Sequence, residues 1–233
     1  MNLFYQPLIT DGAHYLDPDE SRHAVRALRS RAGDIIHITD GKGSHFEARI
    51  TSADQGKCAF EIISEQREPT PVYSVHMAIS PLSHPDRLEW FIEKAVELGV
   101  SQVSLIHCQR TEKRHAKPER LLKIAVGAMK QSQRFILPAI QGPVPFEEFC
   151  SSCKEEQRFI AFVDAANPLH LYRAVEAGKS CAVCIGPEGD FTSEEVAYSM
   201  NKGFKKVSLG NYRLRSETAG VAACHMVNLV NLS

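Results

Sequence analysis

The sequence lacks several patterns that would assign it to a class directly. No apolar run approaches the roughly 20 residues that a membrane-spanning helix needs. The N-terminal stretch MNLFYQPLITDG lacks the basic start and apolar core of a signal peptide, so we expect a cytoplasmic protein. Neither GxGxxG nor GxxxxGKS/T occurs, which disfavours a dinucleotide or nucleoside triphosphate ligand. The net charge of −1 gives no overall indication of a nucleic-acid partner.

The seven cysteines form two CxxC pairs but no complete metal-ligand set. Cys181 and Cys184 lie in the run SCAVCIG, which reads as a buried strand, so their side chains point to opposite faces. Cys150 and Cys153 could share a helix face but lack two further ligands. We therefore predict no metal and reduced, partly buried thiols.

The first 70 residues predict a mostly β region with one helix. Residues 17–20 open the helix with acidic groups, which suit its N-terminal dipole. Short strands are expected at 35–39, 46–51 and 58–63, a spacing that suggests a small barrel, and the polar segment 64–73 reads as a linker. On the helix, Arg22, Arg26 and Arg29 follow i, i+4, i+7 spacing and predict a basic stripe.

From residue 74 onward the pattern alternates between strands and helices. Nearly continuous apolar runs at 74–80, 102–108, 158–164, 180–186 and 205–210 indicate a buried parallel sheet. Capping boxes are expected at Asp86 with Glu89 and at Thr192 with Glu195. The pattern predicts a doubly wound α/β domain. A last helix over 217–232 is apolar around most of its circumference, so it must be buried within the domain or against another subunit.

A basic segment covers residues 109–134, where eight basic residues outnumber two acidic ones. Such a concentration suits a polyanion, although a solvated helix face would have the same composition.

Three segments reach the carboxyl edge of the predicted sheet, where ligands of open parallel sheets bind. They are residues 163–166, 185–190 and 209–219. The second contains Glu188 and Asp190 and no lysine, so it would repel phosphate. Glycines allow close approach of a ligand, and a purine nucleoside with a positive group, such as S-adenosylmethionine, is one candidate.

Several motifs resemble a known family. IGPEGDFTSEE (185–195), LGNYRLRSETAGVAA (209–223) and WFIEKAVELGVSQV (90–103) are similar to signatures of ribosomal RNA small subunit methyltransferase E, a SPOUT-class family. AMKQSQRFILPAI (128–140) and HAVRALRSRAGDIIHITDGKG (23–43) also resemble it, so the likeness spans nearly the whole chain. Asp190 departs from the usual GPEGG loop, the segment 212–219 differs from the expected ILRTETA pattern, and Leu3 stands where an arginine is usual.

The resemblance implies a fold, an activity and partners. The fold would be a PUA-like β-barrel RNA-binding domain (1–70) followed by a SPOUT parallel sheet with a C-terminal trefoil knot (71–233). The activity would be S-adenosylmethionine-dependent methylation of uridine N3 in 16S rRNA, free or in the 30S subunit, by a homodimer. Alternatives are 2′-O-ribose methylation by the same knotted class and a non-catalytic rRNA-binding assembly factor. A nucleotide-dependent oxidoreductase is improbable without a dinucleotide fingerprint.

The resemblance also implies site residues. Residues expected at the cofactor are Phe162, Val163, Asp164, Ile185, Gly186, Pro187, Glu188, Gly189, Leu209, Gly210, Leu214, Thr218 and Ala219. Arg215 would stabilise negative charge on the uracil oxygens, and Glu217 is a possible proton acceptor. Either could instead be structural, through an Arg215–Glu217 pair or as a first-turn acid. Residues expected to bind RNA are Arg22, Arg26, Arg29, Arg110, Arg114, Lys130, Gln131 and Arg134.

Overall fold

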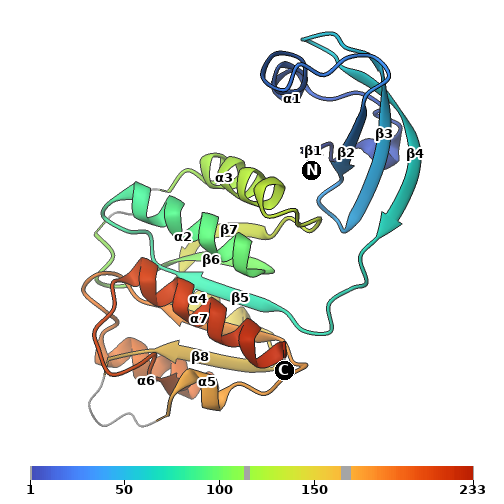
Figure 1. Cartoon of the computed structure of the whole chain (residues 1–233). Helices are drawn as coiled ribbons and strands as arrows, with labels where there is room; N and C mark the ends of the chain where they lie inside the picture. The colour runs from blue at the N-terminus through green and yellow to red at the C-terminus, as the bar shows by residue number, and fades with distance from the viewer. Residues whose placement is uncertain (1, 113–115, 164–168, 233) are drawn as a thin grey trace. The chain divides into compact units, whose positions relative to one another are not determined.

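The computed structural model describes residues 2–112, 116–163 and 169–232. Internal contacts divide the chain into two compact units (Figure 1). The first unit comprises Met1–Thr70 with Val126–Leu137, and the second comprises Pro71–Ala125 with Pro138–Ser233. The first unit therefore includes a segment that follows part of the second in the chain, which the contiguous division at residue 70 did not anticipate.

The first unit is built on a four-stranded sheet in the order β1-β2-β3-β4. Its strands are β1 (Leu3–Tyr5), β2 (Ile35–Thr39), β3 (Ser44–Ser52) and β4 (Ala59–Arg67). β1 is parallel to β2 and the remaining pairs are antiparallel. β1 was not predicted, and β4 continues through 64–67, which had been interpreted as linker. One face of the sheet buries an apolar core.

The helical segment of the first unit begins as predicted but does not stay α-helical. The Asp17 side chain caps α1 (Pro18–Arg22) by accepting the backbone N–H groups of Asp19 and Glu20. A π-helical turn η2 (His23–Ala27) follows, and Arg29 has a left-handed φ of 58°. Arg22, Arg26 and Arg29 are all exposed, but the uniform i, i+4, i+7 stripe is wrong because the helix changes pitch. A short helical turn, η1 (Ile9–Asp11), precedes α1.

The segment 126–137 joins the first unit through backbone hydrogen bonds. It begins within α3 (Pro118–Gln131). The N–H of Gly43 donates to the carbonyl of Phe135 at 2.9 Å, and the N–H of Leu137 donates to the carbonyl of Gly41 at 2.8 Å. The turn between β2 and β3 needs a left-handed glycine, and Gly41 has φ 73°.

The second unit contains a six-stranded sheet in the order β10-β8-β9-β5-β6-β7. All its pairs are parallel, as the continuous apolar runs predicted. Its strands are β5 (Val75–Ile79), β6 (Gln102–His107), β7 (Ala139–Pro145), β8 (Gln157–Ala161), β9 (Cys181–Ile185) and β10 (Lys205–Val207). β7 was not predicted. The segments that follow the parallel strands meet at one edge of the sheet.

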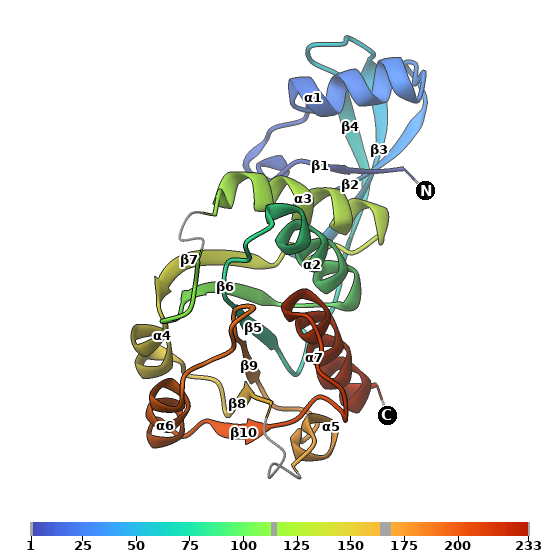
Figure 2. The same ribbon diagram turned by 90° about the vertical axis from the view of Figure 1, so that its left-hand side faces the viewer.

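Helices cover both faces of this sheet (Figure 2). α2 (Pro85–Leu98) packs beside α7 (Ser216–Asn231), while α4 (Phe146–Ser152) and α6 (Ser193–Asn201) pack together on the other face. A short helix, α5 (Leu171–Ala174), contacts α7. The Thr192–Glu195 capping box is confirmed, and α2 ends at Gly99 in the left-handed conformation. The Asp86–Glu89 box is wrong, because α2 begins at Pro85 with His84 as its N-cap.

Candidate functional site

Loops at the carboxyl edge of the second unit's sheet enclose a pocket of about 1100 Å³. The loops following β8, β9 and β10 all contribute to its lining, so the three segments predicted to meet do converge. The volume lies at the upper end of the range for small-molecule sites. Apolar side chains of Phe162, Ile185, Leu209 and Leu214 form part of the wall.

Most residues predicted at a cofactor line this pocket. They are Phe162, Val163, Ile185, Gly186, Pro187, Glu188, Leu209, Gly210, Leu214 and Ala219. Asp164 lies outside the described residues. Among the described positions, Gly189, Glu217 and Thr218 do not line the pocket. A Cβ at Gly189 would be 3.3 Å from the Cβ of Arg110, which accounts for the small residue there.

The pocket also contains residues that the sequence reading missed. Among them are Arg87, Arg173 and Arg213, together with His170, Tyr172 and Tyr212; with the predicted Arg215, four arginines line the pocket. The expectation that the pocket repels phosphate rested on Glu188 and Asp190 alone. It does not hold for the pocket as a whole, because the four guanidinium groups balance the charge of these two carboxylates. Their positions carry no local motif. Arg87 is also distant in the sequence from the loops after β8, β9 and β10, so no local pattern connects it with them.

Hydrogen bonds from neighbouring loops brace the segment after β9. Glu188 accepts the N–H of Ser83 at 2.9 Å, and an Nη of Arg110 donates to the carbonyl of Gly189 at 2.7 Å. Glu195 accepts the N–H of Gln109 at 2.8 Å while it also completes the α6 capping box. Glu188 and Glu195 in the segment 185–195 therefore accept backbone N–H groups of other loops, which explains why carboxylates accompany this glycine-rich turn.

Asp190 occupies a position whose backbone favours glycine. Its φ is 62°, and its carboxylate lines the pocket and accepts the N–H of Phe191 at 2.8 Å. Burial raises the pKa of Asp190, although hydrogen bonds from the backbone of Phe191 and Val163 and the charges of Arg213 and Arg110 act in the opposite direction. The side chain thus links the loop after β9 to the loop after β8.

Arg215 and Glu217 lie at the start of α7 in different environments. Arg215 is exposed, lines the pocket and forms the N-cap of the helix without a side-chain cap. Glu217 is buried in the first turn, and its Oε1 lies 3.8 Å from Nε of Arg87. The ion-pair partner of Glu217 is therefore Arg87 on α2, and not Arg215.

The predicted RNA-binding residues of the basic segment have varied surroundings. Arg110 braces the loop after β9, as described above. Lys130 is paired with Glu20 within the first unit and is largely buried. Gln131 is exposed and Arg134 partly so. Arg114 lies outside the described residues.

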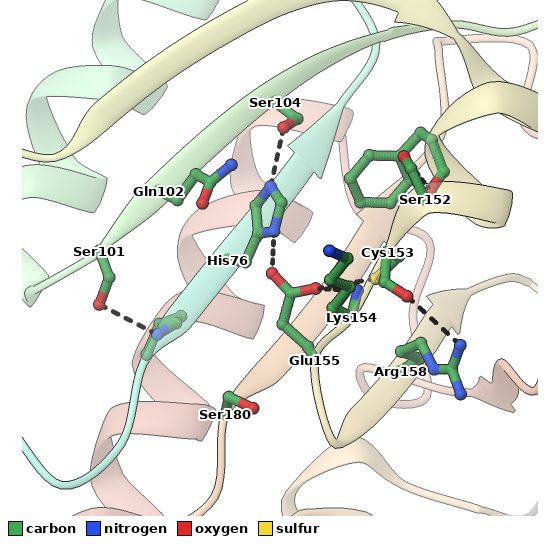
Figure 3. A network of polar contacts seen from close by, with 12 residues as sticks. His76, Ser101, Gln102, Ser104, Ser152, Cys153, Lys154, Glu155, Arg158 and Ser180 are labelled. Atoms are coloured by element: carbon green, nitrogen blue, oxygen red, sulfur yellow. Dashed lines mark hydrogen bonds and ion pairs between the residues drawn. The ribbon is translucent and has the colours of Figure 1, made fainter.

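A second polar cluster lies inside the second unit, on β5, β6 and the loop after α4 (Figure 3). The Nδ1 of His76 contacts Glu155, and its Nε2 lies 2.8 Å from Oγ of Ser104. Glu155 also accepts the Cys153 thiol at 3.0 Å. The order of groups is that of a serine–histidine–carboxylate triad, but Ser104 and His76 are only 4% and 5% exposed. The cluster is a satisfied group of core residues without room for a substrate.

The cysteines form no ligand set in the described chain. None of the seven cysteines, all of which lie in described segments, forms a disulfide, and burial raises the pKa of Cys181 to about 12. Over residues 2–112, 116–163 and 169–232, no three His, Cys, Asp or Glu side chains are grouped so as to hold a metal ion. In the same residues, none of the helices has the length and apolarity to cross a membrane.

Comparison with known proteins identifies the family. A family model described as RNA methyltransferase domain matches residues 68–228, and one described as RNA methyltransferase PUA domain matches residues 16–63. Ribosomal RNA small subunit methyltransferase E of Synechocystis sp. is 31% identical over 229 residues, covering 95% of this chain and 72% of that protein. The chain belongs to the ribosomal RNA small subunit methyltransferase E family. The Aquifex aeolicus member is 28% identical, with 95% and 96% of the two chains covered.

Solved structures agree with membership of the methyltransferase E family. A probable rRNA methyltransferase from Porphyromonas gingivalis is 37% identical and has a TM-score of 0.93, with 100% of this chain and 99% of that chain covered. The family member from Neisseria gonorrhoeae, solved bound to S-adenosyl methionine, is 26% identical with a TM-score of 0.86, covering 99% and 98% of the two chains. The family's architecture, an N-terminal PUA domain followed by an α/β domain with a parallel sheet, is the architecture of this chain.

Proposed function

We propose that this protein transfers the methyl group of S-adenosylmethionine to N3 of a uridine in 16S rRNA of the small ribosomal subunit. The observation that carries the proposal is the convergence of three loops on one pocket within the region matched by the RNA methyltransferase domain model. Two similar structures carry this cofactor, from Neisseria gonorrhoeae and, at 25% identity, from Legionella pneumophila.

The pocket's residues suit an adenosine that bears a positive group. A Cβ at Gly210 would meet no atom within 4 Å, so the glycine leaves open space there, and Ala219 adds little bulk. Apolar side chains offer a surface for a purine, and backbone groups of the loops offer hydrogen bonds. We assign the cofactor to Phe162, Val163, Ile185 to Glu188, Leu209, Gly210, Leu214 and Ala219, with Asp164, Gly189 and Thr218 nearby in sequence. When bound, S-adenosylmethionine supplies an electrophilic methyl group on a cationic sulfur.

Arg215 is the residue that we assign to the substrate base. Uridine N3 is protonated at neutral pH, and as its proton leaves, negative charge spreads onto O2 and O4. A guanidinium next to these oxygens stabilises the charge as it develops. Arg215 is exposed, lines the pocket and lies beside the proposed cofactor residues Leu214 and Ala219, which supports this role. Holding N3 in line with the methyl group supplies a further part of the rate.

We assign RNA binding to the region 1–70 as a PUA-like barrel, and catalysis to 71–233 as a SPOUT domain whose C-terminal part forms a trefoil knot. Exposed arginines at 22, 26 and 29 support the first assignment. Gln131 and Arg134 are further candidates, with Arg110, Arg114 and Lys130. A homodimer is supported by the exposed apolar residues Leu229 and Leu232 at the end of α7. The site needs no metal, and the substrate, ribosomal RNA, implies action in the cytoplasm.

The proposal is tested by removing and restoring the modification. The gene is deleted, 16S rRNA is digested, and lost methylation is mapped by mass spectrometry. Purified protein and S-adenosylmethionine are then added to rRNA or 30S subunits from the deletion strain. Restoration of a base-methylated uridine is expected. A methyl group restored on ribose would show the 2′-O-methylating alternative, and cofactor binding without any transfer would contradict the enzymatic proposal.

A further inference from the structure

One of the arginines that line the pocket forms an ion pair with a residue 130 positions away in the sequence. Arg87 lines the pocket from α2, and Glu217 lies behind it on α7. The Nε of Arg87 is 3.8 Å from Oε1 of Glu217, which is too long for a hydrogen bond between these atoms. The pair therefore fixes the guanidinium electrostatically and leaves its N–H donors available to a ligand.

The two residues differ in exposure and in their effect on their helices. The side chain of Arg87 is 31% exposed, whereas that of Glu217 is 10% exposed. Arg87 occupies the first turn of α2, where the helix dipole disfavours a cation. Glu217 occupies the first turn of α7, where the dipole favours an anion. The negative charge of Glu217 therefore offsets the unfavourable interaction between Arg87 and the dipole of α2.

Close packing one turn further along both helices holds this pair in register. Gly220 on α7 faces Phe91 on α2, and a Cβ at position 220 would lie 2.6 Å from Cε2 of the ring. Phe91 is fully buried. This close packing of Gly220 against a buried ring sets the separation of the two helices near their first turns, and with it the position of Arg87.

We propose that Arg87 is a second guanidinium directed at the RNA substrate, and that Glu217 is a positioning residue that holds Arg87 and does not accept the N3 proton. The inference rests on the proposed function. Arg87 binds an anionic oxygen of the target nucleotide. That oxygen belongs either to a phosphate, which is charged before reaction, or to the uracil ring, which becomes charged as N3 loses its proton. Arg215 and Arg213 line the same pocket and provide further cationic groups.

The two oxygen sources predict different kinetics. A contact with phosphate exists in the ground state, so its loss raises KM and leaves kcat nearly unchanged. A contact with a uracil oxygen strengthens only as charge develops, so its loss lowers kcat. The experiment measures methyl transfer by full-length protein to 16S rRNA from the deletion strain, with saturating S-adenosylmethionine.

The variants are Arg87→Ala, Arg87→Lys, Glu217→Gln and the double variant Arg87→Ala with Glu217→Gln. We expect Arg87→Ala to lower kcat/KM about 100-fold, the typical effect of removing one charge-stabilising donor. Arg87→Lys keeps a point charge and restores part of the loss. Glu217→Gln lowers kcat/KM about 10-fold alone and adds nothing to Arg87→Ala, the coupling expected of residues that act together. Cofactor affinity, measured calorimetrically, changes less than about threefold in each variant because neither Arg87 nor Glu217 is among the residues assigned to the cofactor.

Lys94→Ala is the matched control, since Lys94 lies on the same helix, is 32% exposed and pairs with Glu97 outside the pocket lining. Its activity should equal that of the wild type. The dependence of the rate on pH separates positioning from proton transfer. If Glu217 were the essential base, Glu217→Gln would abolish the rise of the rate with increasing pH; a positioning role predicts that the variant keeps this rise. If Glu217→Gln lost the rise of rate with pH, or if Arg87→Ala were as active as Lys94→Ala, the inference about Arg87 and Glu217 would be overturned while the proposed function would stand. Wild-type protein that binds cofactor but methylates no rRNA would overturn the proposed function as well.

Discussion

Gly220 on α7 lies against the ring of Phe91 on α2, so closely that a Cβ at position 220 would be 2.6 Å from Cε2 and 2.8 Å from Cδ2. Phe91 is fully buried and cannot move away. This contact sets the approach of the two helices whose first turns carry Arg87 and Glu217. Core packing and the geometry of the pocket are therefore linked through one glycine.

Gly220→Ala should destabilise the protein, because overpacking of a tight core costs about 1–3 kcal/mol. The better helix propensity of alanine recovers less than about 1 kcal/mol of that loss. The control is Gly127→Ala on α3, which should be neutral or stabilising because a Cβ at this position would meet no neighbouring atom within 4 Å. Urea unfolding of both variants measures the difference. Equal stability of the two would show that the α2–α7 contact adjusts freely.

Gly186→Ala should weaken cofactor binding more than Gly189→Ala. A Cβ at position 186 would lie 3.1 Å from Cδ2 and 3.2 Å from the backbone N of Phe191, which is buried. A Cβ at 189 would lie 3.3 Å from Cβ and Cδ of Arg110, but Gly189 does not line the pocket, so crowding at this position should affect the cofactor less. We expect about a tenfold loss of affinity for Gly186→Ala, equivalent to about 1.4 kcal/mol. Calorimetric titration with S-adenosylmethionine checks the order, and a larger loss at position 189 would contradict it.

Local patterns in the sequence predicted most of the second unit. Continuous apolar runs correctly indicated five of its parallel strands, and the Thr192–Glu195 pattern correctly indicated a capping box. β7 was missed because its sequence, AIQGPVP, contains glycine and two prolines and lacks an apolar run.

The sequence predicted only those site residues that lie in the loops after the parallel strands. The segments after β8, β9 and β10 could be placed together because parallel strands end at one edge. Arg87 could not, since its approach to the pocket depends on how α2 packs against α7. The ion-pair partners of Lys130 and Glu217 likewise come from distant segments, Glu20 and α2, and no periodicity in the sequence reports such tertiary contacts.

Replacing Arg22, Arg26 and Arg29 by alanine should weaken RNA binding and reduce its salt dependence. At present Arg22 pairs with Asp19 and Arg26 donates to Gln55, both at the surface, and such contacts are weak enough to exchange for phosphate. Three lost phosphate contacts reduce the slope of log K against log salt by about 2. Filter binding of 16S rRNA at several salt concentrations measures the slope. Arg49→Ala is the control in the same unit, because Arg49 is exposed and paired with Glu61, and a slope unchanged in the triple variant would assign the three arginines to solvent.

The contact between His76 and Glu155 should make stability depend on pH. Burial alone would raise the pKa of Glu155, but hydrogen bonds from His76 and Cys153 lower it to about 2, against an ordinary value of 4.5. A carboxylate whose pKa is lower in the folded state stabilises that state above its unfolded pKa. This contribution is therefore complete above about pH 4.5 and is lost as the pH falls towards 2.

Glu155→Gln should accordingly lower the free energy of unfolding at pH 7 by about 2 kcal/mol, a value reduced to allow for partial solvent access of the carboxylate. The difference from the wild type should narrow at pH 3, because the wild-type carboxylate then approaches its folded-state pKa and the variant has no charge to lose. Urea unfolding at pH 7, 5 and 3 gives the three differences. Glu61→Gln, which removes an exposed partner of Arg49, should change stability little at each pH. Only the contribution of an ionised carboxylate is lost on protonation. A difference in the free energy of unfolding between Glu155→Gln and the wild type that stays constant from pH 7 to pH 3 would therefore mean that the cluster stabilises the fold through packing and neutral hydrogen bonds.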